Sequence, residues 1–256
     1  MPRGYRPVQV SKRGGGKREV YAPLPRLARE QQSILERLYS LQVSLPHAHG
    51  FVLGRSIVTN ATPHCGKTYV INLDLRSFFH TVTEKRARGA LLLLTGDGAF
   101  AREAAKACTA QPSPARGRHL LQGQCTSPLI ANLCAARLDR RLHSAATQYG
   151  YAYTRYADDL TLSGNGPFGT LLALVRYVVQ CEGFTVNERK TRIMKSPGLQ
   201  LVTGLSVNGE RPTLPPRVLE RYRVTLHKVS HSVRHGILGH LGMVYGKARG
   251  LSKREP

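Results

Sequence analysis

In YVINLDL, residues 69–75, Tyr69, Ile71, Leu73 and Leu75 occupy every second position, and Asn72 and Asp74 lie between them. Because successive side chains of a strand point to opposite faces, this pattern predicts a strand whose polar face carries Asp74. In YAYTRYADDLTL, residues 151–162, aromatic and leucine residues flank Ala157 and Asp158. This pattern predicts two short strands joined by a turn at these two residues. The chain is therefore expected to display two adjacent acids at a hairpin tip and a third acid on another strand.

Other segments have the three-to-four-residue spacing of apolar positions that is typical of helices. Ser127 is expected to cap one of these helices, with Pro128 in its first turn. Three consecutive glycines predict a tight turn in a basic hairpin over residues 5–22, and a short strand pair is expected within 199–209. The predicted helices cover residues 27–41, 84–110, 127–142, 169–181 and 216–233.

The chain carries 38 lysine and arginine residues against 15 aspartate and glutamate residues, a formal net charge of +23. A charge this large repels itself in a compact fold unless a polyanion offsets it, so nucleic acid is the expected partner. The five cysteines show no metal-site spacing and are odd in number, so neither a zinc site nor a disulfide framework is expected. Without an apolar run long enough for a membrane span, we expect no membrane partner and a cytoplasmic location.

Two adjacent carboxylates repel each other, which raises the pKa of at least one of them unless a cation lies nearby. Asp158 and Asp159, with Asp74 from another strand, therefore predict a divalent metal site, and Mg²⁺ prefers such carboxylates together with phosphate oxygens. A polymerase, a nuclease or a cyclase could use two such ions for phosphoryl transfer. An Asp-Asp pair is also ordinary turn chemistry, but the second acid-bearing strand and the basic chain favour the metal site.

Several motifs in collinear order match those of reverse transcriptases. YADD at 156–159 fits their YxDD motif, DLRSFF at 74–79 is similar to motif A, and QGQCTSP at 122–128 is similar to motif B. NATPH at 60–64 and VTG at 202–204 fit two signatures of the bacterial retron group. The chain therefore resembles the retron-type reverse transcriptases of bacteria.

This resemblance implies an α+β fold of the right-hand polymerase type. Residues 1–68 would form the fingers, including the basic hairpin 5–22. Residues 69–210 would form the palm with its antiparallel sheet, interleaved with fingers helices at 84–120. Residues 211–256 would form a short helical thumb and a basic tail.

The resemblance also implies roles for the acids and for one lysine. Asp74, Asp158 and Asp159 would be catalytic and would bind two Mg²⁺ ions, with the backbone carbonyl of Leu75 as a further ligand. Lys190, in NERKT, matches motif D, where a lysine near the leaving pyrophosphate can act as a general acid.

Substrate contacts follow from the same resemblance. An aromatic residue at the steric-gate position would exclude the 2′-hydroxyl of a ribonucleotide, and Phe79 matches that position. The implied dNTP contacts are Lys12, Arg18, Phe79, Gln122 and Gly123. The implied RNA contacts, in the two retron signatures and the basic thumb helix, are Asn60, His64, Val202, Thr203, Gly204, Arg221 and Lys228.

We therefore expect an RNA-directed DNA polymerase of retron type, which binds a structured non-coding RNA and copies it into DNA. The resemblance implies priming from a guanosine 2′-hydroxyl, which leaves branched RNA-DNA, and a role in antiphage defence together with an effector protein. Two alternatives stay open: a reverse transcriptase like those of group II introns, and a scaffold that binds structured RNA without catalysis.

Two further patterns invite other interpretations. ATPHCGKT, residues 61–68, matches a relaxed phosphate-loop pattern, but such a loop needs a helix to begin at Lys67 and Thr68. The alternating YVINLDL stretch follows instead, so we expect no nucleotide site of that kind. His47 and His49 have HxH spacing without a third nearby ligand, so we expect no metal site there either.

Overall fold

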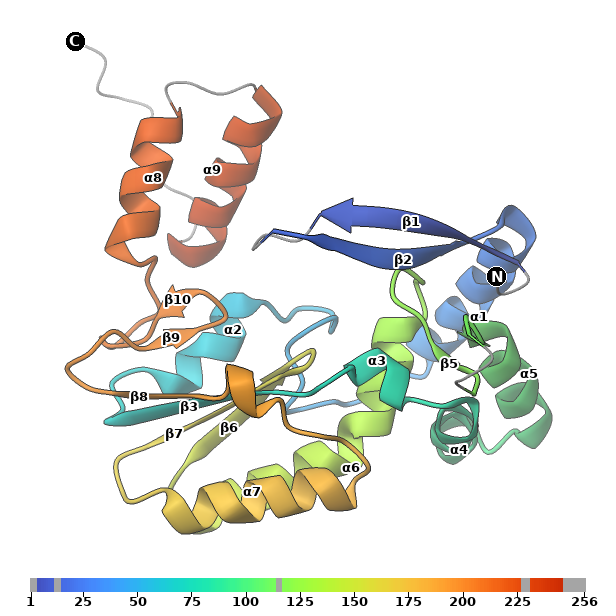
Figure 1. The fold of residues 1–256 in the computed structure, drawn as a ribbon, viewed down its shortest axis with the longest axis horizontal. Coiled ribbons are helices and arrows are strands. Elements are labelled where there is room, and N and C mark those ends of the chain that lie inside the picture. The colour runs from blue at the N-terminus through green and yellow to red at the C-terminus, as the bar shows by residue number, and fades with distance from the viewer. Residues whose placement is uncertain (1–3, 12–14, 114–116, 227–230, 246–256) are drawn as a thin grey trace.

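Four strands form the antiparallel sheet at the centre of the fold, in the order β6-β7-β3-β8 (Figure 1). They are Ala152–Tyr156 (β6), Asp159–Gly164 (β7), Tyr69–Asp74 (β3) and Arg192–Lys195 (β8). β6 and β7 are the two arms of the predicted hairpin, and β3 is the predicted acid-bearing strand. The alternation of apolar positions therefore identified three of the four strands.

The protein is seen here in a computed structural model. Within the described residues, no helix is long and apolar enough to cross a membrane. The predicted dNTP contact Lys12 and the predicted RNA contact Lys228 lie outside those residues. The structure describes residues 4–11, 15–113, 117–226 and 231–245.

Two helices, α6 (Ser127–Gln148) and α7 (Gly169–Cys181), cover one face of the sheet (Figure 1). Burial of a large apolar side chain contributes roughly 1.5–3 kcal/mol, so this layer supplies much of the free energy that keeps the acid-bearing strands in register. Its buried side chains include Ile71, Leu73, Leu160, Leu162, Ile130, Leu138, Leu142, Val175 and Val179.

The opposite face carries a smaller core around Val70. Here the sheet meets α2 (Ile57–Ala61), the 3₁₀ turn Thr62–His64 (η1), and a short hairpin of β9 (Leu201–Val202) and β10 (Leu205–Ser206). This core attaches both retron-signature segments to the sheet.

His64 is fully buried between the 3₁₀ turn and the β6–β7 hairpin. Its Nδ1 lies 2.7 Å from Ser163 Oγ, and its Nε2 lies 2.8 Å from Thr154 Oγ1. Burial lowers the pKa of His64 to about 3. The ring is therefore neutral at physiological pH, and each hydroxyl can complement the ring nitrogen that it faces.

The N-terminal part of the chain forms a hairpin and a helical unit beside the sheet. The hairpin, β1 (Tyr5–Ser11) and β2 (Lys17–Pro23), leads into α1 (Pro25–Ser40). α1 packs on α5 (Gly98–Cys108), which packs in turn on α4 (Glu84–Thr95). The basic hairpin and the helix that follows it are thus as predicted. Shorter elements complete this region: α3 (Phe78–Thr81), β4 (Thr109–Ala110) and β5 (His119–Leu120).

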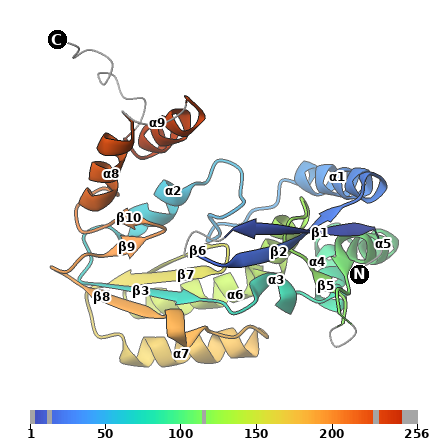
Figure 2. The ribbon, with the colours of Figure 1, turned by 45° about the horizontal axis from the view of Figure 1, so that its top comes forward.

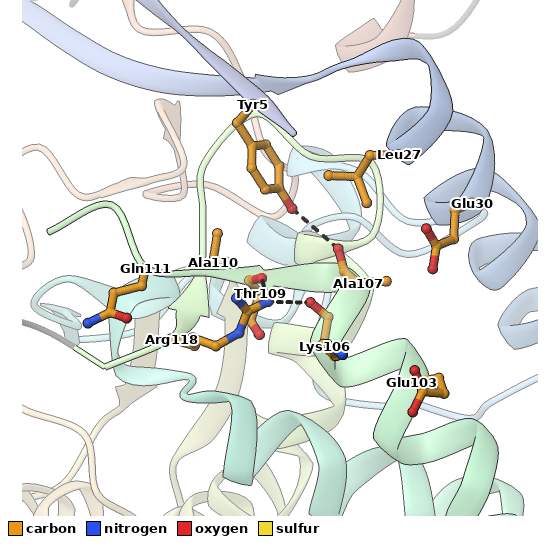
Figure 3. A pocket seen from close by; sticks show the side chains of 10 residues that line it. All are labelled: Tyr5, Leu27, Glu30, Glu103, Lys106, Ala107, Thr109, Ala110, Gln111 and Arg118. Carbon is orange, nitrogen blue, oxygen red and sulfur yellow. Dashed lines mark hydrogen bonds between the residues drawn. The ribbon is translucent and has the colours of Figure 1, made fainter. Parts of the chain in front are cut away.

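Figure 3 shows a pocket of about 480 Å³ where the hairpin meets α1 and α5. The Tyr5 hydroxyl, from β1, donates to the Ala107 carbonyl at 3.3 Å. Gln31 Nε2, buried in α1, donates to the Tyr5 hydroxyl oxygen and to Gln124 Oε1, each at 3.0 Å. These hydrogen bonds fix the base of the hairpin to the helical unit.

Two expectations about helix ends are wrong. The single helix expected over 84–110 is two helices, because Gly96 turns the chain into the left-handed conformation that commonly ends a helix. Ser127 does not cap α6 either. It is the first helical residue, and its hydroxyl donates to the Leu121 carbonyl at 2.8 Å.

The C-terminal part forms two helices, α8 (Pro216–Leu226) and α9 (His231–Tyr245), which lie side by side beyond β9 and β10 (Figure 2). The single helix expected over 216–233 is therefore wrong, because the described residues of this range belong to two separate helices, α8 and α9. Tyr222 and His240 join the two helices, with 2.6 Å between the hydroxyl and Nδ1.

We expect His64→Gln to make the stability of the fold less dependent on pH. Folded His64 stays neutral down to about pH 3, whereas an unfolded histidine takes up a proton near pH 6.5, so the wild type loses stability as the pH falls below about 6.5. At about 1.4 kcal/mol per pH unit, the variant should lose about 2 kcal/mol less than the wild type between about pH 6.5 and about pH 5. Urea unfolding at both values measures the difference, and equal losses would contradict the neutral burial of His64.

Candidate active site

The turn between β6 and β7 brings two acids against the end of β3. In the β3–β7 register Asp74 lies opposite Asp159, and the Leu75 N–H donates to the Asp158 carbonyl at 2.8 Å. Ala157 closes the turn in the left-handed conformation, with φ of +56°. The three acids therefore lie together at one end of the sheet, as their strands predicted.

The pKa values of both turn aspartates are raised. Burial raises the pKa of Asp158, and the charge of Asp74 adds to this effect. Burial, together with the charges of Asp158 and Asp74, raises the pKa of Asp159 to about 6. Carboxylates that resist ionisation because they lie partly desolvated beside one another favour the binding of a cation.

The NERKT segment supplies two partners to Asp74. Lys190 Nζ lies 2.9 Å from Asp74 Oδ2, and Asn187 Nδ2 donates to Asp74 Oδ1 at 2.9 Å. The hydrogen bond to Asp74 raises the pKa of Lys190. A charged ammonium group therefore lies beside the acids at neutral pH.

The acids line a cleft of about 660 Å³. Three cations line the same cleft, Arg18 from β2 and Lys190 and Arg192 from the run that leads into β8, as do Thr203 and Gly204 from the β9–β10 turn. The β1–β2 hairpin, which carries Arg18, lies beside the β6–β7 turn (Figure 2). A polyanionic substrate would therefore meet both the cations that can bind its phosphates and the carboxylates that can bind metal ions.

The predicted dNTP contacts are not all in this cleft. Arg18 lines the cleft and Phe79 does not. Phe79 is half-buried on α3, and its ring packs edge-to-face on Phe78 with 5.6 Å between centroids. Its steric-gate role stays a prediction.

The motif B loop contacts the β1–β2 hairpin. The Gln122 carbonyl accepts a hydrogen bond from the Tyr21 N–H at 2.9 Å. Gly123 has φ of +100°, and a Cβ atom there would lie 3.2 Å from Val20 Cβ. Glycine is favoured here by its backbone conformation and by the space that β2 leaves. The dNTP contacts implied for Gln122 and Gly123 stay predictions, and in the structure a strand of the hairpin is their close neighbour.

Three predicted RNA contacts are wrong. The side chains of Asn60, His64 and Val202 are 0% exposed, so RNA at the surface cannot touch them. They support the packing of α2 and β9 on the sheet instead. The turn residues 203–204 line the cleft and Arg221 is exposed on α8, so their RNA contacts stay predictions.

Arg192 and Asn187 also belong to the site, although no sequence motif singled them out. β8 pairs with β3 so that Arg192 lies opposite Asn72, and this register brings the arginine to the cleft. Asn187 orients the carboxylate of Asp74. The basic residues of NERKTRI are typical of a phosphate-binding segment. The register of this segment against β3 could not be predicted, however, because the spacing of its residues does not show which residue of β3 each one faces.

The two other patterns have ordinary structural explanations. No helix begins within 65–68, because the 3₁₀ turn ends at His64 and β3 starts at Tyr69. The 61–68 segment therefore lacks the helix of a phosphate loop, as expected. The His47 ring stacks on that of His143 at 4.0 Å, and His49 Nδ1 lies 2.9 Å from Thr59 Oγ1.

We expect Asp159→Asn to stabilise the metal-free protein at neutral pH. Folding raises the pKa of Asp159 to about 6, above the value of about 4 in an unfolded chain, so its charge opposes folding above about pH 6 and no longer does so near pH 4. Because this side chain is partly exposed, screening leaves a gain of about 1 kcal/mol rather than the 3 kcal/mol of a fully buried group.

Urea unfolding in EDTA at about pH 7.5 and about pH 4 measures this gain, which should vanish at the lower pH. Glu210→Gln, at an exposed acid, is the control and should change little at either pH. A variant less stable than the wild type at about pH 7.5 would contradict the raised pKa of Asp159 in the folded protein.

The family model "Reverse transcriptase (RNA-dependent DNA polymerase)" matches residues 10–205. The chain is 42% identical to Retron Mx65 reverse transcriptase of Myxococcus xanthus, over 90% of this chain and 57% of that protein. It is 37% identical to Retron Mx162 reverse transcriptase of the same organism, over 85% and 51%, respectively. Retron Ec86 reverse transcriptase of Escherichia coli is 31% identical, over 88% and 70%. The chain thus spans little more than half the length of the two Myxococcus relatives.

Solved structures of telomerase share the fold. Telomerase from Candida albicans, in complex with a TWJ fragment of telomeric RNA, matches with a TM-score of 0.58 at 11% identity, over 95% of this chain and 53% of that one. Apo telomerase from Candida tropicalis, truncated from its C-terminal domain, matches with a TM-score of 0.56 at 12% identity, over 81% and 54%. At these identities the likeness establishes only the right-hand polymerase fold. The chain belongs to the reverse transcriptase family, and its relatives there include the bacterial retron reverse transcriptases.

Proposed function

We propose that the protein is an RNA-directed DNA polymerase, which extends a DNA strand on an RNA template from dNTPs. The observation that carries this proposal is the convergence of Asp74, Asp158 and Asp159 in a cleft that also contains three cations. A polymerase needs both groups, because metal-bound carboxylates act on the reacting phosphate while cations hold the nucleic-acid backbone. Membership of the reverse transcriptase family selects a polymerase over a nuclease or a cyclase.

Asp74 and Asp158, with the backbone carbonyl of Leu75, would hold two Mg²⁺ ions, and Asp159 would have a lesser part. Among the residues that the structure describes, no three His, Cys, Asp or Glu side chains already form a group of metal ligands. The donor chemistry nevertheless fits, since Mg²⁺ prefers carboxylate oxygens and would offset the desolvation and the repulsion that together raise the pKa of both turn aspartates. When bound, the two ions polarise the reacting phosphate and stabilise the attacking and leaving oxygens.

In this proposal the cations of the cleft differ in function, one as a proton donor and others as ligands of the triphosphate. Lys190 would donate a proton to the leaving pyrophosphate, and its raised pKa keeps it protonated beside Asp74. Arg18 on β2, together with Lys12, would bind the triphosphate of the incoming dNTP. The remaining nucleotide contacts in this proposal are Phe79, Gln122 and Gly123.

A structured non-coding RNA is the proposed partner. The net charge of +23 supports a polyanionic ligand, and the exposed Arg221 on α8 and the cleft residues 203–204 are candidate contacts. Similarity to proteins named retron reverse transcriptases favours priming from a guanosine 2′-hydroxyl, with branched RNA-DNA as the product. The setting in this proposal is antiphage defence in the bacterial cytoplasm, with an effector protein as a further partner.

We expect the purified wild type to carry DNA joined to RNA, and the double variant Asp158→Ala, Asp159→Ala to carry RNA alone. The double variant removes two carboxylates that would hold the metal ions. Primer extension on an RNA template with dNTPs and Mg²⁺ should therefore fall by about a thousandfold or more, since bound metal supplies several kcal/mol of transition-state stabilisation. Sequencing of the copurified nucleic acid, with and without ribonuclease treatment, measures the first outcome.

Glu210→Gln is the matched control, because it removes an exposed carboxylate that does not line the cleft. The same DNA in wild type and double variant would refute the polymerase. RNA alone in both preparations would favour the non-catalytic scaffold. DNA made on RNA without a branch would favour an enzyme like those of group II introns.

A further inference from the structure

Arg155 is a fully buried cation next to the acid-bearing turn. It lies in β6, two residues before Ala157, and its side chain is 0% exposed. Burial of a guanidinium is unfavourable unless its N–H groups find partners. The position of this arginine therefore needs an explanation beyond the packing of the core.

Four hydrogen bonds hold the Arg155 guanidinium. Nε and Nη2 donate to the two carboxylate oxygens of Asp139 on α6, at 2.8 and 2.7 Å. Nη1 donates to Asn132 Oδ1 at 2.8 Å and to the Ala157 carbonyl at 2.9 Å. The last of these bonds reaches the turn itself, because Ala157 immediately precedes Asp158.

A second contact comes from the segment that precedes α2. Asn132 Nδ2 donates to the Gly50 carbonyl at 2.9 Å. Gly50 lies so close to the turn that a Cβ atom there would be 2.6 Å from Ala157 N and 3.2 Å from the Tyr156 carbonyl carbon. The turn is thus held by a hydrogen bond from Arg155 and by close packing against Gly50.

Stability alone does not account for this arrangement. Replacement of a buried ion pair by apolar residues is often neutral or stabilising, so the Arg155–Asp139 pair need not contribute net stability. Ala157 has φ of +56°, an unfavourable conformation that a non-glycine residue keeps only where its neighbours hold it in place. Arg155 and Gly50 are these neighbours. Their contacts fix the orientation of the peptide that joins Ala157 to Asp158.

The same arginine also contacts the segment that follows Asp74. Arg155 Cζ lies 5.6 Å from the centroid of the Phe78 ring, and Phe78 begins α3, just beyond the end of β3. Phe78 packs in turn on Phe79, the predicted steric gate. One guanidinium therefore touches the segments on both sides of the acid site.

We propose that four residues, which we name the turn clamp, are positioning residues that set where Asp158 lies relative to Asp74. The inference rests on the proposed function, because this placement matters if the two acids share the metal ions of a polymerase. Supporting residues of this kind typically tune metal affinity and activity without touching the metal. The turn clamp consists of Gly50, Asn132, Asp139 and Arg155.

Gly50→Ala tests the turn clamp without removal of a buried charge. The Gly50 backbone is outside the left-handed region, so the added methyl acts through its close approach to Ala157 N. Gly169→Ala is the matched control, because a Cβ atom there meets nothing within 4 Å. Gly50→Ala should lower kcat for primer extension about tenfold and weaken Mn²⁺ binding, measured by electron paramagnetic resonance, about tenfold. The KM for dNTP should stay close to that of the control, whereas the melting temperature should fall, because backbone atoms of the turn must shift to make room for the methyl.

Asn132→Ala is a second test, which applies even if Gly50→Ala folds poorly. It removes the link between Arg155 and Gly50, retains the ion pair with Asp139 and introduces no clash. We expect losses of kcat and of Mn²⁺ affinity in the same direction and of similar size.

Wild-type kcat and Mn²⁺ affinity in a well-folded variant of either kind would overturn the turn clamp. A lowered melting temperature with unchanged Mn²⁺ affinity would also overturn it, because that result marks a purely structural role. If the wild type itself extends no primer, the proposed function fails. Mn²⁺ binding by the wild type and the two variants still tests the turn clamp in that case.

Discussion

Three carboxylates at the end of one sheet repel each other, and the rest of the structure depends on containing that repulsion. The β3–β7 register places Asp74 opposite Asp159. A slip of one residue would turn Asp74 toward the core and bring an apolar side chain to the cleft, so the register is strongly specified. Apolar side chains are buried on both faces of the sheet, against α6 and α7 and around Val70. Hydrophobic burial therefore sustains an acid cluster that electrostatics alone would disperse.

Cations oppose the acids in two different ways. Lys190 lies within the cleft, bonds to Asp74 directly, and its charge offsets part of the rise in the pKa of Asp158 that burial causes. Arg155 lies in the core, and its charge is matched by that of Asp139 at 2.7 Å. It therefore acts on the turn mainly by hydrogen bonding rather than by net charge. A metal ion bound to Asp74 would compete with Lys190 and would leave Arg155 in place. Lys190 is therefore a partner of Asp74 that a metal ion can replace, whereas Arg155 is a fixed part of the core.

The elements and the acids could be predicted from the sequence because they depend on local pattern. Alternation identified β3 and the hairpin, and the turn signal placed Asp158 at its tip. Exposure could not be predicted in the same way, because it depends on partners distant in the chain. His64 was assigned to RNA, yet two hydroxyls from β6 and β7 enclose it. The packing of β2 against Gly123 could not be predicted from its motif either. Arg192 was missed because its place in the cleft depends on a strand register that spacing does not encode.

One helix, α6, connects the two halves of the site. In the loop that leads into it, the Gln122 carbonyl accepts the Tyr21 N–H of β2, the strand that carries Arg18. Two turns apart on the helix itself, Asn132 and Asp139 share a face and bind the buried arginine of β6. A displacement of α6 would therefore move the proposed triphosphate-binding cation and the proposed metal-binding acids together. The distance between the two groups is then set by a single helix of 22 residues, rather than by the two turns that carry them.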